Sequence, residues 1–380
     1  MKTLRFMIIA GEASGDGHAA KLVRAIRENA PDRDTEFFGS AGPRMRDAGV
    51  VATVEADALS IVGLAEIGRA LPMFLRTMKR LKAAAAGNRP DVAILVDFPD
   101  FNLKLAKHLK KRGIKVVYYI SPQLWAWRKY RLSTIKKYVD LMLTILPFEK
   151  DWYEENGVTH VEYVGSPLAR EVHADTTKEQ FCSTHGLDPS KTIITLLPGS
   201  RHKEITRILP VMLAAAEKLT ADRRDVQFVL AAGSGKQRSD IERIVSDSQV
   251  KIVVVENETY NALKASDAAA VTSGTATLET GIIGTPLVIV YKTSGINYKL
   301  LEPFINVPHY GLINLIAGER VATELIQERF TADTLADEIA RLLLPDVNAS
   351  MRARLKETAD KLGHGGASKR AAEAILKIVG

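Results

Sequence analysis

The sequence has 380 residues, of which 46% are hydrophobic, 26% charged and 6% aromatic. This length exceeds what one hydrophobic core usually supports, so we expect two domains of roughly 150–200 residues. It contains no low-complexity tract or short repeat, which excludes a disordered chain and a solenoid. The single cysteine, Cys182, excludes an intramolecular disulfide and a cysteine-rich metal site.

The formal net charge of +7 favours an anionic partner. Charge alone leaves nucleic acid, a phosphorylated substrate and an acidic lipid surface open. The first residues lack the apolar stretch of a signal peptide, and charged residues interrupt every apolar run before the roughly 18–20 residues that span a bilayer. We therefore expect a cytoplasmic protein that crosses no membrane.

Short apolar runs alternate with helical patterns, which is typical of parallel α/β units. The first half predicts strands at 4–9, 92–96, 116–120 and 141–144, and the second half at 192–197, 227–230, 252–255, 268–272 and 287–290. We place the domains at 1–168 and 169–350, with a linker near 167–175. A helical tail at 351–380 follows, and its last helix, 366–380, lies beyond a glycine-rich break.

Residues 11–16, Gly-Glu-Ala-Ser-Gly-Asp, directly follow the first strand and open a helix. Small residues and free backbone N–H groups at such a strand end favour a ligand, which makes Glu12, Ser14 and Gly15 candidates. The segment is not G-x-G-x-x-G, and no acidic residue ends an obvious second strand, so a dinucleotide site is not indicated. A tight turn without a ligand is the alternative.

Asp97 comes immediately after the buried strand 92–96 and should project into the same crevice. A carboxylate there can take the proton of an attacking hydroxyl, so Asp97 is our candidate general base. The alternative is a helix cap, and we assign that role to Asp100, before the helix expected near Phe101. Trp125 and Trp127 lie beside another strand end, where such rings stack on a sugar or pack in the core.

In the second half, Gly199, Ser200 and Arg201 follow a strand and precede a helix expected near Glu204. The helix dipole favours a phosphate oxygen, and Arg201 can neutralise a departing diphosphate. The alternative is that Arg201 belongs to a solvated basic cluster with His202, Lys203 and Arg207.

Residues 272–279, Thr-Ser-Gly-Thr-Ala-Thr-Leu-Glu, also join a strand to a helix. Ser273, Gly274 and Thr275 suit a phosphate and Glu279 suits ribose hydroxyls, although Glu279 can instead complete a capping box. No H-E-x-x-H, D-x-D or P-loop pattern is present, so we expect no metal.

Together these segments resemble the lipid-A-disaccharide synthase family, whose motifs GEASGD, DFPDFN, SPxxWAWR, LPFE, LPGSR and SGTATLE occur here in that order between Gly11 and about Gly318. The resemblance implies an α/β, GT-B-like fold of two Rossmann-like domains whose parallel sheets face a central cleft, plus C-terminal helices. It also implies transfer of 2,3-diacylglucosamine from its UDP derivative to the 6-hydroxyl of 2,3-diacylglucosamine 1-phosphate, without metal or cofactor. Under this interpretation nucleic acid is not a partner.

The resemblance assigns the base to Asp97, an essential arginine to Arg201, an acidic residue to Glu12 and nucleotide contacts to residues 273–279 and Asn314. It suggests a homodimer and a last helix that returns to the first domain. Two departures are Gly165-Ser166-Pro167, where the family commonly has G-H-P, and Leu312-Ile313-Asn314, where it usually has L-P-N. A histidine role therefore does not transfer to Ser166.

Acylated substrates imply contact with the cytoplasmic face of an anionic inner membrane. Residues 59–82 mix apolar and basic side chains, as a membrane-surface helix does, although an ordinary half-buried helix has the same periodicity. The predicted acceptor and lipid contacts are Ser14, Gly15, Asp100, Trp125, Leu71, Met73, Phe74 and Arg76. The alternatives are a UDP-N-acetylglucosamine epimerase or soluble-substrate transferase of the same fold, and a non-catalytic carrier.

Overall fold

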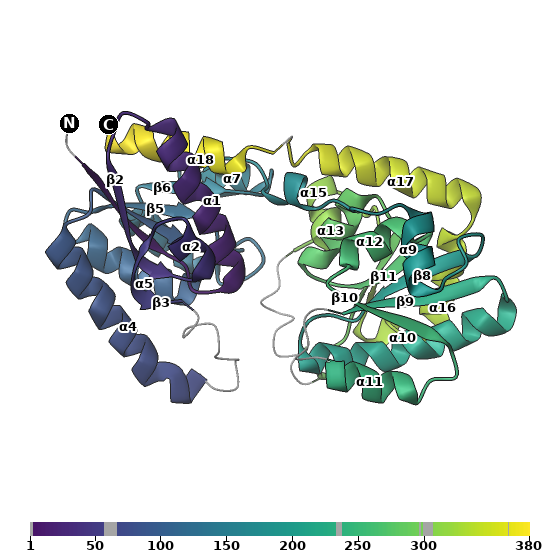
Figure 1. Ribbon diagram of the computed structural model, residues 1–380. Coiled ribbons are helices and arrows are strands. Elements are labelled where there is room, and N and C mark those ends of the chain that lie inside the picture. Colours follow the sequence, from purple (N-terminus) through teal and green to yellow (C-terminus); the bar gives the residue numbers. More distant parts are fainter. Residues whose placement is uncertain (1–2, 57–66, 233–237, 296–297, 299–306, 364) are drawn as a thin grey trace. The chain divides into compact units, whose positions relative to one another are not determined.

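The computed structural model describes residues 3–56, 67–232, 238–295, 298, 307–363 and 365–380. The chain divides into two compact units, each with its own parallel sheet (Figure 1). Unit 1 comprises Met1–Pro167 and His364–Gly380, and unit 2 comprises Leu168–Gly363. The predicted first domain ended one residue later. Residues 351–363 of the predicted tail belong to unit 2, and the rest of the tail belongs to unit 1.

The sheet of unit 1 has seven parallel strands in the order β3-β2-β1-β4-β5-β6-β7. The strands are β1 (Leu4–Ile9), β2 (Thr35–Ala41), β3 (Val51–Glu55), β4 (Val92–Val96), β5 (Lys115–Tyr119), β6 (Leu141–Thr144) and β7 (Val161–Tyr163). The helices are α1 (Ala13–Asn29), α2 (Pro43–Asp47), α4 (Ile67–Asn88), α5 (Pro99–Lys110), α6 (Leu132–Tyr138), α7 (Glu149–Glu155) and α18 (Ala367–Val379), with a 3₁₀ turn at Lys129–Arg131.

Helices cover both faces of this sheet, which explains why its strands read as continuous apolar runs. Phe6 and Ile8 of β1 point into a core shared with α1 and α18, whereas Met7 and Ile9 point into a second core shared with α4, α5 and α6. The C-terminal helix α18 therefore completes the core of unit 1. Arg370 fastens it to the sheet by donating from Nε to the Val164 carbonyl at 2.8 Å.

Unit 2 has six parallel strands in the order β10-β9-β8-β11-β12-β13. They are β8 (Thr192–Leu197), β9 (Val226–Ala232), β10 (Ile252–Glu256), β11 (Ala268–Thr272), β12 (Leu287–Tyr291) and β13 (Glu324–Ile326). The helices are α8 (Leu168–Glu171), α9 (Lys178–His185), α10 (His202–Asp222), α11 (Arg238–Ser246), α12 (Thr259–Ala265), α13 (Thr275–Ile283), α15 (Leu312–Ala317), α16 (Ala332–Leu342) and α17 (Pro345–Asp360), with a 3₁₀ turn at Gln327–Arg329. In Figure 1, α10 and α16 lie on one side of this sheet, and α12 and α13 on the other.

Both sheets have the strand order of a doubly wound Rossmann-like fold. This confirms the predicted fold class for each half of the chain. The predicted central cleft concerns the placement of one unit relative to the other and stays a prediction.

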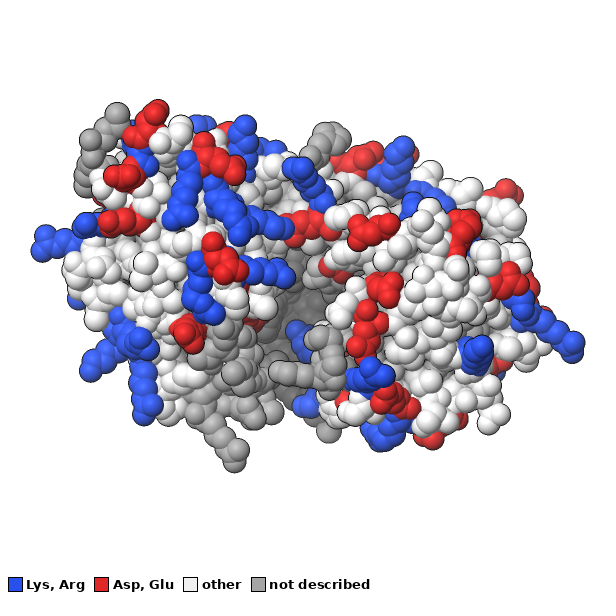
Figure 2. Space-filling model, in the orientation of Figure 1, with Lys and Arg blue, Asp and Glu red and all other residues white. Residues whose placement is uncertain are grey.

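Positive and negative side chains are interspersed on the visible face of each unit (Figure 2). The net charge of +7 is therefore not gathered there into the single-sign stripe typical of nucleic-acid binding. Within the described ranges, no helix is long and apolar enough to span a bilayer.

Candidate active site

Each sheet has one topological switch point, where the chain reverses the direction in which it adds strands. In unit 1 it lies between β1 and β4, and in unit 2 between β8 and β11. Ligands of doubly wound folds bind outside the carboxyl ends of the strands at this point. The loops that leave these four strands begin at Ala10, Asp97, Pro198 and Ser273, so four of the sequence motifs lie at the two switch points.

Asp97 continues the β4 ladder by donating its N–H to the Tyr119 carbonyl at 3.0 Å. Its φ is +47° and that of Phe98 is +51°, two successive left-handed conformations that cost roughly 1–2 kcal/mol each in residues with a Cβ. Two buried side chains hold the turn. The Asp97 carbonyl accepts from Tyr118 Oη at 2.6 Å and from Asn102 Nδ2 at 2.7 Å. Such strain clusters at functional sites.

Burial raises the pKa of Asp97 from 3.8 to about 6, and the negative charge of Glu12 adds to the effect. The Phe98 N–H opposes it by hydrogen bonding to the carboxylate. A carboxylate with this pKa is ionised at neutral pH and more basic than an ordinary aspartate, which suits a general base.

In the Gly11–Asp16 segment, the backbone packs closely against the Phe98 ring at Gly11, and the Asp16 side chain holds the start of α2. A Cβ at Gly11 would lie 2.4 Å from the Phe98 ring, so only glycine fits beside the strained turn. Glu12 and Ser14 are exposed at the start of α1, and Gly15 is buried. Asp16 is buried and accepts from the backbone N–H groups of Gly42, Arg44 and Met45, so it holds α2 rather than a ligand.

Asp100 does not cap a helix, and that prediction is wrong. Pro99 starts α5 two residues earlier than expected, with Phe98 at the N-cap and no side-chain cap. Asp100 instead accepts hydrogen bonds from Arg128 and Arg131, two arginines that follow the tryptophans.

Trp125 is 8% exposed and packs edge-on against Phe148. Its indole N–H donates to Glu149 Oε1 at 3.1 Å, and the same oxygen accepts from Ser121 Oγ at 2.7 Å. This arrangement matches the core-packing alternative, because a ring so deeply buried offers no face to a sugar. Trp127, at 48% exposure, is the accessible ring of the pair.

The predicted membrane stretch coincides with α4 only in part, because residues 59–66 lie outside the described residues. Leu71 and Leu75 are 56% and 62% exposed, and Arg76 is exposed beside them. Met73 is partly buried, and the Phe74 ring packs against Phe98 and Phe101 with centroids 6.1 and 6.2 Å away. The accessible apolar face of α4 is therefore narrower than predicted.

In unit 2, Arg201 directly precedes α10, whose first residue is His202 rather than a residue near Glu204. The Arg201 side chain is 77% exposed and pairs with Glu204 at 2.9 Å. The carboxylate of Glu204 also accepts from the N–H groups of Ser200 and Arg201, at 3.2 and 3.3 Å. These donors at the positive helix end are those that a phosphate oxygen would use.

The neighbouring loop joins β11 to α13. Ser273 Oγ donates to the Tyr310 carbonyl at 2.7 Å, and Gly274, with φ +148°, precedes the exposed Thr275. Glu279 accepts from Tyr260 Oη at 3.1 Å, so the capping-box alternative is wrong. Burial raises the pKa of Glu279.

Asn314 is fully buried, and its amide group already has four hydrogen bonds. It donates to Ala322 O and Glu324 Oε1 and accepts from the N–H groups of Val321 and Ala322. A nucleotide contact would have to break one of these bonds. Ser166 is also fully buried, and its hydroxyl has no partner in the described part of the chain.

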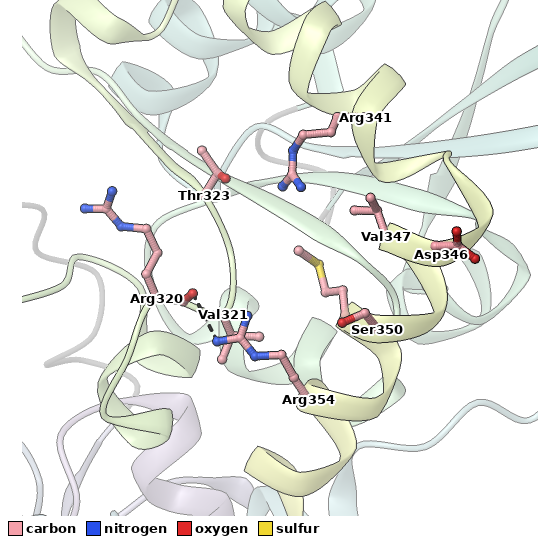
Figure 3. Close-up of a pocket in the computed structure, with 9 residues that line it drawn as sticks. Arg320, Val321, Thr323, Arg341, Asp346, Val347, Ser350 and Arg354 are labelled. Atoms are coloured by element: carbon pink, nitrogen blue, oxygen red, sulfur yellow. Dashed lines mark hydrogen bonds between the residues drawn. The ribbon is translucent and has the colours of Figure 1, made fainter.

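A pocket of about 400 Å³ in unit 2 lies apart from these loops (Figure 3). Its lining includes Thr323, which precedes β13, and residues of α16 and α17. It therefore opens at the amino end of β13, whereas the switch-point loops leave the carboxyl ends of parallel strands. Across the described ranges, no cluster of three or more His, Cys, Asp or Glu side chains is arranged to hold a metal ion.

Comparison with known proteins supports the resemblance read from the motifs. The family model described as lipid-A-disaccharide synthetase matches residues 6–379. The chain belongs to the lipid-A-disaccharide synthase family. The lipid-A-disaccharide synthases of Trichlorobacter lovleyi and Myxococcus xanthus are 43% and 44% identical to it, each covering 99% of this chain and 97% of its own length.

Solved structures with low sequence identity share the fold. A putative UDP-N-acetylglucosamine 2-epimerase from Listeria monocytogenes is 16% identical, with a TM-score of 0.66 and coverage of 99% of this chain and 96% of its own. The glycosyltransferase of kitacinnamycin is 13% identical, with a TM-score of 0.64 and full coverage of both chains. These structures confirm the GT-B-like architecture, while the family match decides between the transferase and epimerase interpretations.

Sequence reasoning found the family's motifs but missed several of the side chains that organise them. Tyr118, Asn102 and Glu149 hold the base loop and the tryptophan segment from buried positions. Asn102 ends the motif DFPDFN and Glu149 ends the motif LPFE. A polar residue at the end of each motif could have indicated a buried hydrogen-bonding role. Tyr118 offered none, because a tyrosine within a buried strand reads as core.

Proposed function

We propose that this chain transfers 2,3-diacylglucosamine from UDP-2,3-diacylglucosamine to the 6-hydroxyl of 2,3-diacylglucosamine 1-phosphate, with inversion, giving the β-1,6-linked disaccharide 1-phosphate and UDP. Membership of the lipid-A-disaccharide synthase family supports this reaction. The single observation that carries the mechanism is Asp97, a carboxylate of pKa about 6 on a strained turn at the switch point of unit 1.

In the proposed mechanism Asp97 accepts the proton of the acceptor's 6-hydroxyl as its oxygen attacks the anomeric carbon. The bond between that carbon and UDP breaks in the same step. Because the nucleophile enters opposite UDP, the α-linked donor gives a β-linked product without a covalent intermediate. Burial, and secondly the charge of Glu12, keep the pKa of Asp97 high, which strengthens the base.

We assign the nucleotide to unit 2. Ser200, Arg201 and the first turn of α10 offer N–H donors and a positive charge to the diphosphate, and Ser273–Thr275 offer a second helix start on the neighbouring strand. Glu279, half-buried behind that start, is the candidate for ribose hydroxyls. Arg201 would stabilise the charge on the departing UDP once it leaves Glu204.

Acylated substrates reside in a bilayer, so we propose peripheral contact with the cytoplasmic face of the inner membrane through α4. The exposed Leu71 and Leu75 beside Arg76 support this contact. Association into a homodimer stays a prediction.

The decisive experiment measures disaccharide 1-phosphate formation from both substrates in mixed micelles containing EDTA, with Asp97→Asn alongside. We expect robust wild-type turnover, and a fall of at least about 100-fold in kcat for a variant that still binds UDP. Absence of wild-type product would overturn the substrate assignment. Full activity on deacylated substrates would favour a soluble-substrate transferase, interconversion of UDP-N-acetylglucosamine an epimerase, and UDP binding without turnover a carrier.

A further inference from the structure

Two arginines converge on one carboxylate beside the base loop. Arg128 Nη1 lies 3.1 and 3.0 Å from the two carboxylate oxygens of Asp100, and Arg131 Nη2 donates to the first of them. The Asp100 side chain is 70% exposed, whereas those of Arg128 and Arg131 are 35% and 10% exposed. The carboxylate can therefore turn into water while the two cations stay in place.

Stability alone does not account for this cluster. Ion pairs with an exposed partner contribute little to stability. Two unfavourable features oppose this small gain: the desolvation of Arg131 and the left-handed backbone of Arg128, whose φ of +58° is strained for a residue with a Cβ. The Arg128 guanidinium also stacks over the Trp127 ring at 4.1 Å, which fixes its plane. The arrangement keeps two guanidinium groups ready for an anion.

The cluster adjoins the candidate base. Asp100 is three residues beyond Asp97 and lies in the first turn of α5, directly after the strained base loop. Burial raises the pKa of Tyr118, and the charges of Asp97, Arg131 and Asp100 all act on the same hydroxyl. That hydroxyl donates to the Asp97 carbonyl. Base and cations thus share one neighbourhood in unit 1.

We propose that Arg128 and Arg131 form the subsite for the phosphate of the acceptor, and that Asp100 occupies it as a removable counter-ion until the acceptor binds. This inference rests on the proposed function, in which the phosphate and the reacting hydroxyl belong to the same sugar ring. A phosphate monoester carries about −1.5 to −2 charges and matches paired guanidinium groups better than one carboxylate does. Its binding would set the 6-hydroxyl toward Asp97.

The test compares KM for 2,3-diacylglucosamine 1-phosphate and for the same lipid without phosphate in the wild type, Arg128→Gln, Asp100→Asn and a control. Arg24→Gln, an exposed arginine of α1, removes the same charge outside the cluster. We expect Arg128→Gln to raise KM for the phosphorylated acceptor about tenfold or more and to leave that for the unphosphorylated lipid unchanged. Asp100→Asn should lower KM for the phosphorylated acceptor, because no carboxylate has to be displaced.

Equal KM increases for both lipids in Arg128→Gln would overturn the proposal and make the cluster a positioning element. A KM increase in Asp100→Asn as large as that in Arg128→Gln would do the same. A loss as large in Arg24→Gln would show a general charge effect and also reject the subsite. Failure of the proposed function is distinct from these outcomes, because the wild type would then form no disaccharide from either lipid.

Discussion

At the scale of single residues, Asp97 illustrates how a functional group opposes stability. Its pKa is raised from 3.8 to about 6 in the folded protein, so the carboxyl group favours folding below pH 3.8 and loses this contribution as the pH rises through 6. Ionised Asp97 then lowers the free energy of unfolding by up to about 3 kcal/mol.

Asp97→Asn should therefore stabilise the protein while it inactivates it. The amide carries no charge to desolvate, and asparagine tolerates the left-handed backbone well. We expect the free energy of unfolding to rise by about 1–3 kcal/mol at pH 7.5 and to approach the wild-type value near pH 4. Thermal unfolding at the two pH values measures this, and a lower Tm at pH 7.5 would contradict the electrostatic account.

Glu12→Gln should change the pH dependence of the reaction. Glu12 is the second cause, after burial, of the raised pKa of Asp97. Without its charge the pKa of Asp97 falls, so the acid limb of kcat/KM, expected near pH 6, moves to lower pH. A kcat/KM profile of the wild type and the variant between pH 4.5 and pH 8 shows the displacement. A limb that stays in place would mean that another group controls it.

The role of a single residue can be inferred from the sequence when its chemical type differs from that of the residues around it. Asp97 is a candidate because a charged residue directly after a buried strand has few structural reasons to be there, and Arg201 because it lies in the short loop between β8 and α10. Their roles stay predictions. The opposite holds for Trp125, whose burial depends on Glu149, the first residue of α7, which is 24 residues away in the sequence. Asp100 was misassigned because Pro99, which fits the first helical position, moved the helix start.

At the scale of elements, α4 should bind membranes through two leucines. The double variant Leu71→Asp, Leu75→Asp should weaken binding to vesicles containing anionic phospholipid by at least about tenfold, since each buried leucine contributes roughly 1.5–3 kcal/mol. Both side chains are largely exposed, so Tm should change little. Cosedimentation with vesicles measures the binding.

The matched control is Leu344→Asp, which changes an equally exposed leucine of unit 2. It should leave vesicle binding unchanged. Phe74→Ala provides the complementary comparison, because its ring packs against Phe98 and Phe101, and its loss should lower stability. Equal binding by the α4 double variant and the wild type would exclude α4 as the membrane contact.

Element prediction succeeded where a strand is a continuous apolar run in the sequence. The nine predicted strands all occur, with ends shifted by at most two residues, because helices on both faces impose continuous apolar runs. Four strands were missed. β7 and β13 have three residues each, β3 is only partly buried, and β2 contains Gly39 and Ser40, so none shows a long apolar run in the sequence.

At the scale of the whole molecule, the two-fold repetition of an α/β pattern was enough to predict two domains. The division of the tail was not predictable from periodicity, because α17 and α18 are both amphipathic and only their partners differ. Met351 and Leu355 of α17 are buried in unit 2, whereas Ala371 and Ile375 of α18 are buried in unit 1.

This division makes the last helix a test of how the molecule unfolds. Ile375 is fully buried in the core that unit 1 builds from its sheet, α1 and α18. Ile375→Ala should destabilise unit 1 by about 2–5 kcal/mol, because it removes apolar contacts and leaves a cavity. Unit 2 has its own sheet and core, so its unfolding should change little.

Scanning calorimetry with and without UDP distinguishes the two transitions, since a ligand raises the Tm of the unit that binds it. Glu373→Ala, an exposed change on the same helix, is the control. If Ile375→Ala lowered both transitions equally, the two units would unfold as one cooperative body, and α18 would stabilise the whole chain rather than its first half.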